Sequence, residues 1–371
     1  MRRVFAGLLA VSVVGTSGGL GTGTAQANPW YPQPCPGGPY PAESCLPASP
    51  LVHGSTAATV YAVGGARAPG IPWYEYTMRA GADWFPDARR ELIEYPAGAP
   101  FSWMPQFVLP PGPRDEETIG EAATLATSSL DQAIVDGSGR QAGQQAVVGL
   151  SQGTLALDQV QARLADDPNA PSPDQLTFTT IGDPTGKHAF GQSFLSEVFG
   201  PGEYIPLIDY TMPPETESQY SSNRVVAMYD GLADFPDRPQ NVFAVANAVA
   251  GSAITHTPAA FTSPDIVPPQ NIRSEVNSKG ATTTSFLIPV TSLPLTLPLR
   301  YLGVPGWSVD MLDGALQPII DAGYSRNDDP ATRPVTVTPA GMDPIGSLDP
   351  GTRASIEKTF ADVRNLFGVL G

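Results

Sequence analysis

The chain has 371 residues, of which 36 are acidic and 20 are Lys or Arg, so its formal net charge at pH 7 is −16. This charge argues against nucleic acid, whose phosphates need a basic surface, and against an anionic membrane surface. Hydrophobic residues make up 41% and charged residues 15% of the chain, which provides a large core and excludes a disordered protein. With 38 Gly and 41 Pro, we expect many loops around the regular elements.

The first residues have the pattern of a secretory signal. Arg2 and Arg3 precede a run of small and apolar residues, Val4–Val14, and the Ala-Gln-Ala at residues 25–27 is the small-x-small pattern that signal peptidase accepts. The apolar run is shorter than the about 20 residues that span a bilayer. We therefore expect cleavage of residues 1–27, no transmembrane span in the mature chain, and a protein that is secreted or held in the cell envelope.

Residues 28–57 form a Pro-rich N-terminal arm that contains both cysteines of the chain, Cys35 and Cys45. An oxidising compartment favours a disulfide between them, which would contribute about 3 kcal/mol by restricting the unfolded chain. Their spacing fits neither a CxxC redox site nor a zinc cluster, and three scattered histidines cannot build a metal site. We expect no metal and no cofactor.

Predicted strands and helices alternate along residues 58–326. The predicted strands cover residues 58–63, 91–95, 145–150, 176–181 and 224–229, and the predicted helices cover residues 116–135, 154–164 and 240–250. Hydrophobic strands that alternate with helices indicate a parallel sheet covered on both faces. The expected fold class is therefore α/β.

Two segments do not follow this alternation. Residues 190–223 are rich in Gly, Pro and Tyr without a clean period, which is typical of a lid-like insertion or binding loop. Residues 282–301 are apolar, but their prolines and Arg300 exclude a membrane helix. Residues 190–223 and 286–299 offer side chains for an acyl-chain groove, although ordinary packing explains them equally well. Residues 327–371 are expected to form an extension made of a linker and a terminal helix that starts near Pro350.

The run Gly149–Gly153 (GLSQG) matches the pattern GxSxG. The motif alone is weak, but it lies between a predicted strand and a predicted helix, as a nucleophile elbow requires. Ser151 would occupy the sharp turn, and the backbone N–H of Gln152 would lie at a helix N-terminus, where it favours a developing oxyanion. A second oxyanion donor is expected from Gly65 or Ala66, in the loop after the first strand. The alternative is a surface serine in a Gly-rich turn.

A nucleophilic serine needs a base, and the chain contains three histidines, His53, His188 and His256. In α/β-hydrolases the base follows the nucleophile and the acid in chain order. His53 precedes Ser151, and His188 precedes any acid on the next strand. His256, in a loop after the last predicted helix, is the expected base, with a solvated loop histidine as the alternative.

The acid of the triad should follow the strand over residues 224–229. Asp230 lies at the strand end, where it suits the capping of a turn. Asp234 lies beyond Gly231, where the chain can curl back toward a histidine, so we prefer Asp234 and keep Asp230 as the alternative. Asp183, after the preceding strand, is a third candidate. The acid must stay ionised in order to fix the imidazole tautomer and stabilise the imidazolium.

Several segments resemble a known family: GLSQG, FTTIGDP, MYDGLADFPDRPQNVFAVANAVAG, ITH, SLPLTLPLR and DAGYSR. Over about Thr59 to Arg326 the chain is similar to the PE-PPE C-terminal domain, a cutinase-like serine α/β-hydrolase of mycobacteria and related actinobacteria. The YDGxADFP and GYxR segments are more specific than GxSxG. The chain has neither the PE nor the PPE helical module and has a secretory signal in their place, which implies export by the general route.

The resemblance implies an α/β-hydrolase fold with a central, mostly parallel sheet flanked by helices. It also implies a triad of Ser151, an aspartate of YDGLADFP and His256. The IGDP segment and the Gly-x-x-Asp placement of Asp234 are similar to cutinases, which favours Asp234 over Asp230. Some members of the family are implicated in moving acyl chains onto trehalose glycolipids, whereas others behave as esterases.

Three functions remain open at this point. The first is a secreted serine esterase that acts on lipid esters through an acyl-enzyme. The second is an envelope acyltransferase that moves acyl chains between trehalose-type glycolipids with the same triad. The third is a non-catalytic lipid- or wall-binding protein on a hydrolase scaffold. The expected partner is a lipid ester or an acylated glycolipid, with peripheral association with the envelope, and sequence does not choose between water and sugar as acyl acceptor.

Overall fold

The computed structural model describes residues 57–67, 73–98, 117–139, 143–214 and 217–367. The predicted signal peptide, the cysteine pair and almost all of the Pro-rich arm lie outside these residues.

The centre of the molecule is a seven-stranded sheet with the strand order β10-β11-β9-β4-β3-β1-β2. Its strands are β1 (Thr59–Val63), β2 (Arg89–Leu92), β3 (Gln145–Leu150), β4 (Leu176–Ile181), β9 (Ser222–Ala227), β10 (Ile272–Val276) and β11 (Thr282–Ile288). All neighbouring strands are parallel except β10, which runs antiparallel to β11. Every residue of β1 and β3 is buried, because helices cover both faces of the sheet. The mostly parallel sheet is therefore confirmed.

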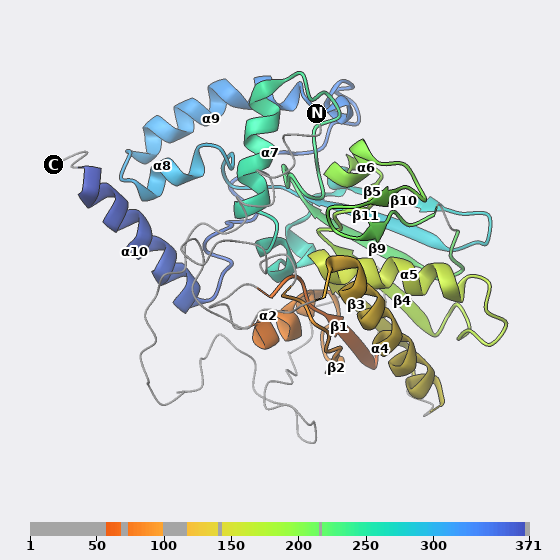
Figure 1. Cartoon of the computed structure of the whole chain (residues 1–371). Helices are drawn as coiled ribbons and strands as arrows, with labels where there is room; N and C mark the ends of the chain where they lie inside the picture. Colours follow the sequence, from red (N-terminus) through yellow and green to blue (C-terminus); the bar gives the residue numbers. More distant parts are fainter. Residues whose placement is uncertain (1–56, 68–72, 99–116, 140–142, 215–216, 368–371) are drawn as a thin grey trace, which may run out of the picture.

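Helices surround this sheet (Figure 1). The α-helices are α2 (Trp73–Arg79), α4 (Ile119–Gly139), α5 (Thr154–Leu164), α6 (Phe194–Val198), α7 (Val242–Ile254), α8 (Leu297–Tyr301), α9 (Gly306–Asp321) and α10 (Pro350–Phe367). Short 3-10 turns include η1 (Ala82–Trp84), η2 (Ser151–Gly153), η3 (Pro258–Phe261), η4 (Pro264–Ile266), η5 (Pro269–Asn271) and η6 (Ser325–Asn327). Two small hairpins pair β5 (Lys187–His188) with β6 (Gly191–Gln192) and β7 (Tyr204–Ile205) with β8 (Tyr210–Thr211).

The core is divided by the sheet into two layers. Val147 of β3 packs with Leu130 of α4 and other apolar side chains of α4 and α5. Its neighbour Val148 belongs to the opposite layer, together with Ala244 of α7 and Ile320 of α9. Successive residues of a strand point to opposite faces, so a single buried strand serves both layers. The molecule is thus a three-layer α/β structure.

The predicted strands over 145–150 and 176–181 and the predicted helix over 154–164 have the bounds of β3, β4 and α5. The strand predicted over 224–229 ends earlier, at Ala227, because Tyr229 has a left-handed backbone with φ of +64°. This early end leaves the chain a tight turn before Asp230.

The segment over 190–223 contains β6, α6, β7, β8 and the start of β9. Ile205, Ile208 and Tyr210 form a small apolar cluster with Ala123 of α4 and Leu155 of α5. These contacts hold this part of the segment on the outside of the α4–α5 layer. A role as a lid stays a prediction.

The C-terminal extension contacts the sheet. Thr336 accepts a hydrogen bond from the backbone N–H of Val290 with its carbonyl oxygen (3.1 Å), and Met342 is buried. The terminal helix α10 begins at Pro350, as expected. No helix in the described part of the chain combines the length and hydropathy of a membrane span.

Candidate active site

Ser151 lies directly after β3, as the first residue of η2, which leads into α5. Its φ is +51°, a left-handed conformation that is strained for a serine. A side chain at Gly153 would place its Cβ 2.4 Å from the carbonyl oxygen of Val63, so only glycine lets the turn approach β1 this closely. The strand, the strained turn and the helix are the local structure that the GxSxG motif predicted for a nucleophile elbow.

His256 follows α7 and the capping residue Thr255, and only 5% of its surface is exposed. Its ring Nδ1 lies 2.6 Å from Oδ2 of Asp230, which is fully buried. The other carboxylate oxygen, Oδ1, accepts the backbone N–H of Leu232 at 3.0 Å. The ring Nε2 is buried and has no hydrogen-bond partner among the described residues. With Nδ1 bound to the carboxylate, Nε2 is the atom left to accept a proton.

Gly182 shows that the His256 ring lies at the same edge of the sheet as Ser151. Strands β3 and β4 pair with Leu150 opposite Ile181, so Ser151 and Gly182 follow neighbouring parallel strands at the same edge of the sheet. A Cβ on Gly182 would lie 2.9 Å from Cε1 of the His256 ring. The imidazole therefore contacts the residue that follows β4. Strand β3, which leads to Ser151, is the neighbour of β4, and adjacent strands are about 4.8 Å apart.

Asp234 does not face His256, and our preference for Asp234 as the partner of the histidine is therefore corrected. Its carboxylate forms an ion pair with the guanidinium of Arg326 through both oxygens, and Oδ2 also accepts the backbone N–H of Tyr229 at 2.8 Å. The backbone N–H of Asp234 bonds back to the carbonyl oxygen of Asp230 at 2.5 Å. This tight turn directs the two carboxylates to different partners, and Asp230 is the one beside the imidazole.

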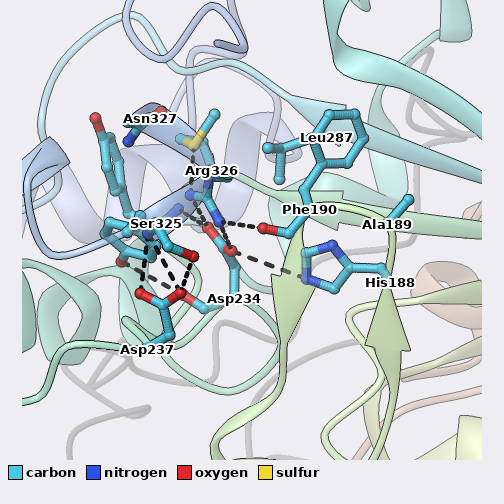
Figure 2. A network of polar contacts seen from close by, with 12 residues as sticks. His188, Ala189, Phe190, Asp234, Asp237, Leu287, Ser325, Arg326 and Asn327 are labelled. Carbon is cyan, nitrogen blue, oxygen red and sulfur yellow. Dashed lines mark hydrogen bonds and ion pairs between the residues drawn. The ribbon is translucent and has the colours of Figure 1, made fainter. Parts of the chain in front are cut away.

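The third histidine belongs to the Asp234 cluster (Figure 2). His188 Nε2 lies 3.8 Å from Oδ1 of Asp234, and burial lowers the pKa of His188 to about 4. Burial also lowers the pKa of Arg326, but Asp234 outweighs it, so that the pKa of the guanidinium is raised. The guanidinium lies 4.2 Å from the ring centre of Tyr324. At neutral pH the cluster is therefore an ion pair beside an uncharged imidazole.

Asp183, the third candidate for the acid, supports the elbow. Its Oδ1 accepts the backbone N–H of Thr185 at 2.9 Å and lies 3.1 Å from Oγ1 of Thr154. The same Thr154 hydroxyl donates to the carbonyl oxygen of Ser151 (2.7 Å). Asp183 thus holds the first turn of α5 in place, and the hydrogen bond of the His256 ring goes to Asp230 instead.

The loop after β1 lies against the elbow. A Cβ on Gly65 would be 3.1 Å from the Cβ of Ser151, and the carbonyl oxygen of Gly65 accepts the indole N–H of Trp73 at 2.7 Å. Gln152 is buried at the turn before α5. The backbone N–H groups of Gln152, Gly65 and Ala66 remain the predicted oxyanion donors.

Sequence reasoning missed two residues of this region. Arg326 was quoted only as part of DAGYSR, and its polar neighbours gave no local signal that it is buried against an acid. Gly182 was quoted only as part of IGDP, although a glycine directly after a buried strand indicates a close approach of another group. Among the described residues, no group of three or more His, Cys, Asp or Glu side chains is arranged to hold a metal ion.

The parallel sheet, the strained serine after its central strand and the buried His–Asp pair at the same edge define a serine hydrolase of the α/β class. The chain belongs to the PE-PPE domain family, whose model matches residues 86–325. The resemblance seen in the sequence is therefore confirmed.

Relatives of known activity include both transferases and an esterase. The chain is 57% identical over 360 residues to diacyltrehalose acyltransferase Chp2 of Mycobacterium tuberculosis, covering 95% of this chain and 97% of that protein. It is 40% identical to SL1278 acyltransferase Chp1 of the same organism, over 68% of this chain and 59% of that protein. It is 33% identical to esterase PE16 of M. tuberculosis, over 62% of this chain and 42% of that protein. The chain is an acyl-transferring enzyme of the serine-hydrolase type.

Proposed function

We propose that the enzyme transfers acyl chains between acylated trehalose glycolipids through an acyl-enzyme on Ser151. The observation that carries this proposal is the buried pair of His256 and Asp230, which stands at the sheet edge beside Ser151 and leaves the ring Nε2 unpaired. The similarity to a diacyltrehalose acyltransferase over nearly the full length of both chains favours transfer to a sugar hydroxyl.

In the first half of the reaction, Oγ of Ser151 attacks the ester carbonyl carbon of the donor lipid and its proton passes to Nε2 of His256. Asp230 holds the opposite ring N–H and stabilises the imidazolium. The backbone N–H of Gln152 and those of the loop at Gly65 and Ala66 hold the oxyanion. The ester C–O bond then breaks, the leaving alcohol takes the proton from Nε2, and the acyl chain stays on Ser151.

In the second half, a hydroxyl of the acceptor sugar gives its proton to Nε2 of His256 and attacks the acyl-enzyme carbonyl. Ser151 leaves and regains the proton, so that one ester is broken and one is formed. Water in place of the sugar gives hydrolysis, and this second candidate function is favoured by the similarity to an esterase. The outcome depends on how well the site excludes water.

We further propose that the protein acts outside the cytoplasm, with residues 1–27 as a cleaved signal peptide and with peripheral association with the envelope. The charged and apolar pattern of these residues supports export. A disulfide between Cys35 and Cys45 fits the oxidising compartment that export implies.

The nucleophile is tested by labelling the protein with a fluorophosphonate and mapping the modified peptide. We expect the label on Ser151, and we expect Ser151→Ala to lower the cleavage of a short-chain ester by at least about 10³-fold. A variant that keeps its rate would refute the acyl-enzyme on Ser151, and an unlabelled protein that cleaves no ester would favour the non-catalytic binding function.

Transfer and hydrolysis are separated by the products formed from diacyltrehalose with an isotope-labelled acyl chain. The proposal predicts that label appears in trehalose of higher acylation, and that this product is absent with Ser151→Ala. Labelled free fatty acid as the sole product would identify an esterase instead.

A further inference from the structure

Helix α9 buries Val309 and Ile320 in the core, but it leaves several large apolar side chains exposed and buries two of its acids. Trp307 and Met311 are each 69% exposed, and Ile319 is 45% exposed. Trp307 and Met311 are four residues apart and are neighbours on the surface of the helix. Two of the three acidic residues of the helix, Asp313 and Asp321, are instead buried. A helix at a water-facing surface normally has the opposite arrangement.

The inward orientation of α9 is held by hydrogen bonds to its acids. Oδ1 of Asp321 accepts the hydroxyl of Tyr229 at 2.6 Å. Oδ1 of Asp313 accepts the hydroxyl of Thr296, and its Oδ2 lies 3.6 Å from the guanidinium of Arg300. Rotating the helix to hide its exposed apolar side would break these bonds, leave the buried hydroxyls of Tyr229 and Thr296 unpaired, and take Val309 and Ile320 out of the core. The buried hydrogen bonds therefore fix the orientation of α9 in which these apolar side chains are exposed.

Helix α7 continues the same apolar surface. Its thirteen residues, VFAVANAVAGSAI, contain no charged side chain. At its N-terminus Val242 is 70% and Phe243 is 46% exposed. The side chain of the capping Asn241 donates to the carbonyl oxygen of Ile319 at 2.6 Å, so the exposed start of α7 meets the exposed end of α9. Figure 1 shows the two helices together on one side of the molecule.

We call this surface the α7–α9 face, defined by the exposed side chains of Val242, Phe243, Trp307, Met311, Leu312 and Ile319. Contiguous apolar patches of this kind mark sites of interaction. The one exposed acid of α9, Asp310, pairs with Arg300 at 2.6 Å. The face therefore presents no unpaired charge of α7 or α9 to a partner.

We propose that the α7–α9 face docks the enzyme on an uncharged lipid layer that holds its glycolipid substrate. The inference rests on the proposed function, because acyl esters of trehalose are uncharged lipids. An uncharged face complements such a layer, whereas the net charge of −16 opposes an anionic one. Helix α7 ends two residues before His256, so this helix connects the docked face with the active site over a length of about 18 Å.

The test measures sedimentation of the full-length Ser151→Ala protein with phosphatidylcholine vesicles, so that binding is independent of turnover. We expect binding, and we expect the double variant Trp307→Ser, Met311→Ser to lose at least about tenfold in affinity because two large apolar side chains no longer enter the lipid. A matched control, Val135→Ser with Val276→Ser, removes apolar side chains that are 54% and 69% exposed elsewhere. It should bind as the parent protein does.

Cleavage of a soluble short-chain ester, measured with Ser151 intact, separates the two proposals. The Trp307, Met311 double variant should keep this activity at the wild-type level while it loses vesicle binding. Unchanged vesicle binding in that variant, or an equal loss in the control, would overturn the docking surface and leave the proposed function standing. Preference for vesicles with phosphatidylglycerol would also overturn it. A dimer of the parent protein that dissociates in the Trp307, Met311 double variant would also overturn lipid docking, because a second copy of the chain would then cover the α7–α9 face.

Discussion

Asp230 and Asp234 belong to one turn, yet their carboxylates bind different partners. Asp230 contacts the imidazole of His256, whereas the carboxylate of Asp234 accepts hydrogen bonds from Arg326 and from the backbone N–H of Tyr229. A carboxylate that is paired in this way to a buried guanidinium has no oxygen to offer a histidine without leaving the cation unpaired. The residue that orients the base and the residue that stabilises the turn are therefore distinct.

Replacing each aspartate by asparagine should separate these two roles. Asp230→Asn keeps the shape of the turn but no longer favours the tautomer that leaves Nε2 free, so we expect a loss of about 10³- to 10⁴-fold in kcat with a small change in Tm. Asp234→Asn leaves Arg326 buried without its counter-charge and should lower the free energy of unfolding by about 3 kcal/mol. Ester-cleavage kinetics and urea unfolding of both variants measure these effects. A larger loss of kcat in Asp234→Asn at unchanged stability would reverse the assignment.

The placement of Ser151 and His256 at one edge of the sheet could be predicted from the sequence, whereas the aspartate that contacts His256 could not. Ser151 and His256 follow from a local motif and from chain order, because the carboxyl ends of parallel strands meet at one edge. The choice of acid depends on where Arg326 lies, and Arg326 is 92 residues away from Asp234 in the chain. A local pattern has no information about such a distant partner.

At the scale of elements, α7 and the turn after β9 pack with almost no space between them. A Cβ on Gly251 of α7 would lie 1.8 Å from the carbonyl oxygen of Tyr229. This close approach sets the position of the end of α7, and with it the separation of His256 from Asp230.

Gly251→Ala should therefore be both destabilising and damaging to catalysis. The added methyl group forces α7 away from the turn, so we expect a loss of at least about 2 kcal/mol in unfolding free energy and a lower kcat. Gly314→Ala is the matched control, because a Cβ on Gly314 of α9 meets nothing within 4 Å and the exchange should raise stability by up to about 1 kcal/mol. Urea unfolding and ester cleavage of both variants measure the contrast, and equal effects of the two exchanges would show that the packing is not limiting.

The elements differ in how far sequence patterns predict them. The predicted bounds of β3, β4 and α5 agree with the structure to the residue, because each strand is a buried apolar run with a glycine at or after its end and the residues after Gly153 have a helical period. The segment over 190–223 has no period of its own, and its structure comes from packing of Ile205 and Tyr210 on α4 and α5. Tertiary contacts of this kind leave no local signal.

At the scale of the whole molecule, the cluster of His188, Asp234 and Arg326 ties together three distant parts of the chain. His188 comes from β5, Asp234 from the turn after β9 and Arg326 from η6. Figure 2 shows the three side chains converging. Any change in the charge of this cluster should affect the global stability.

The molecule should lose stability in mild acid through His188. Burial lowers the pKa of His188 to about 4, whereas an unfolded histidine has a pKa of about 6.5. Between these values the unfolded chain binds a proton that the folded chain does not, so the free energy of unfolding falls as the pH falls, by about 3 kcal/mol in total.

The measurement is urea unfolding of the wild type and of His188→Gln at several pH values between 7.5 and 4. Carboxylates titrate in both proteins, so the difference between the two curves isolates the histidine. The variant should show a weaker loss of stability toward acid. Parallel curves would mean that His188 titrates alike in the folded and unfolded states.

The ion pair between Arg326 and Asp234 also limits how far the enzyme can be truncated. The family match begins at residue 86 and ends at residue 325, so a gene fragment trimmed to those borders would omit the interior strand β1 and the guanidinium that pairs with Asp234. The smallest version worth expressing starts upstream of Thr59 and continues past Arg326.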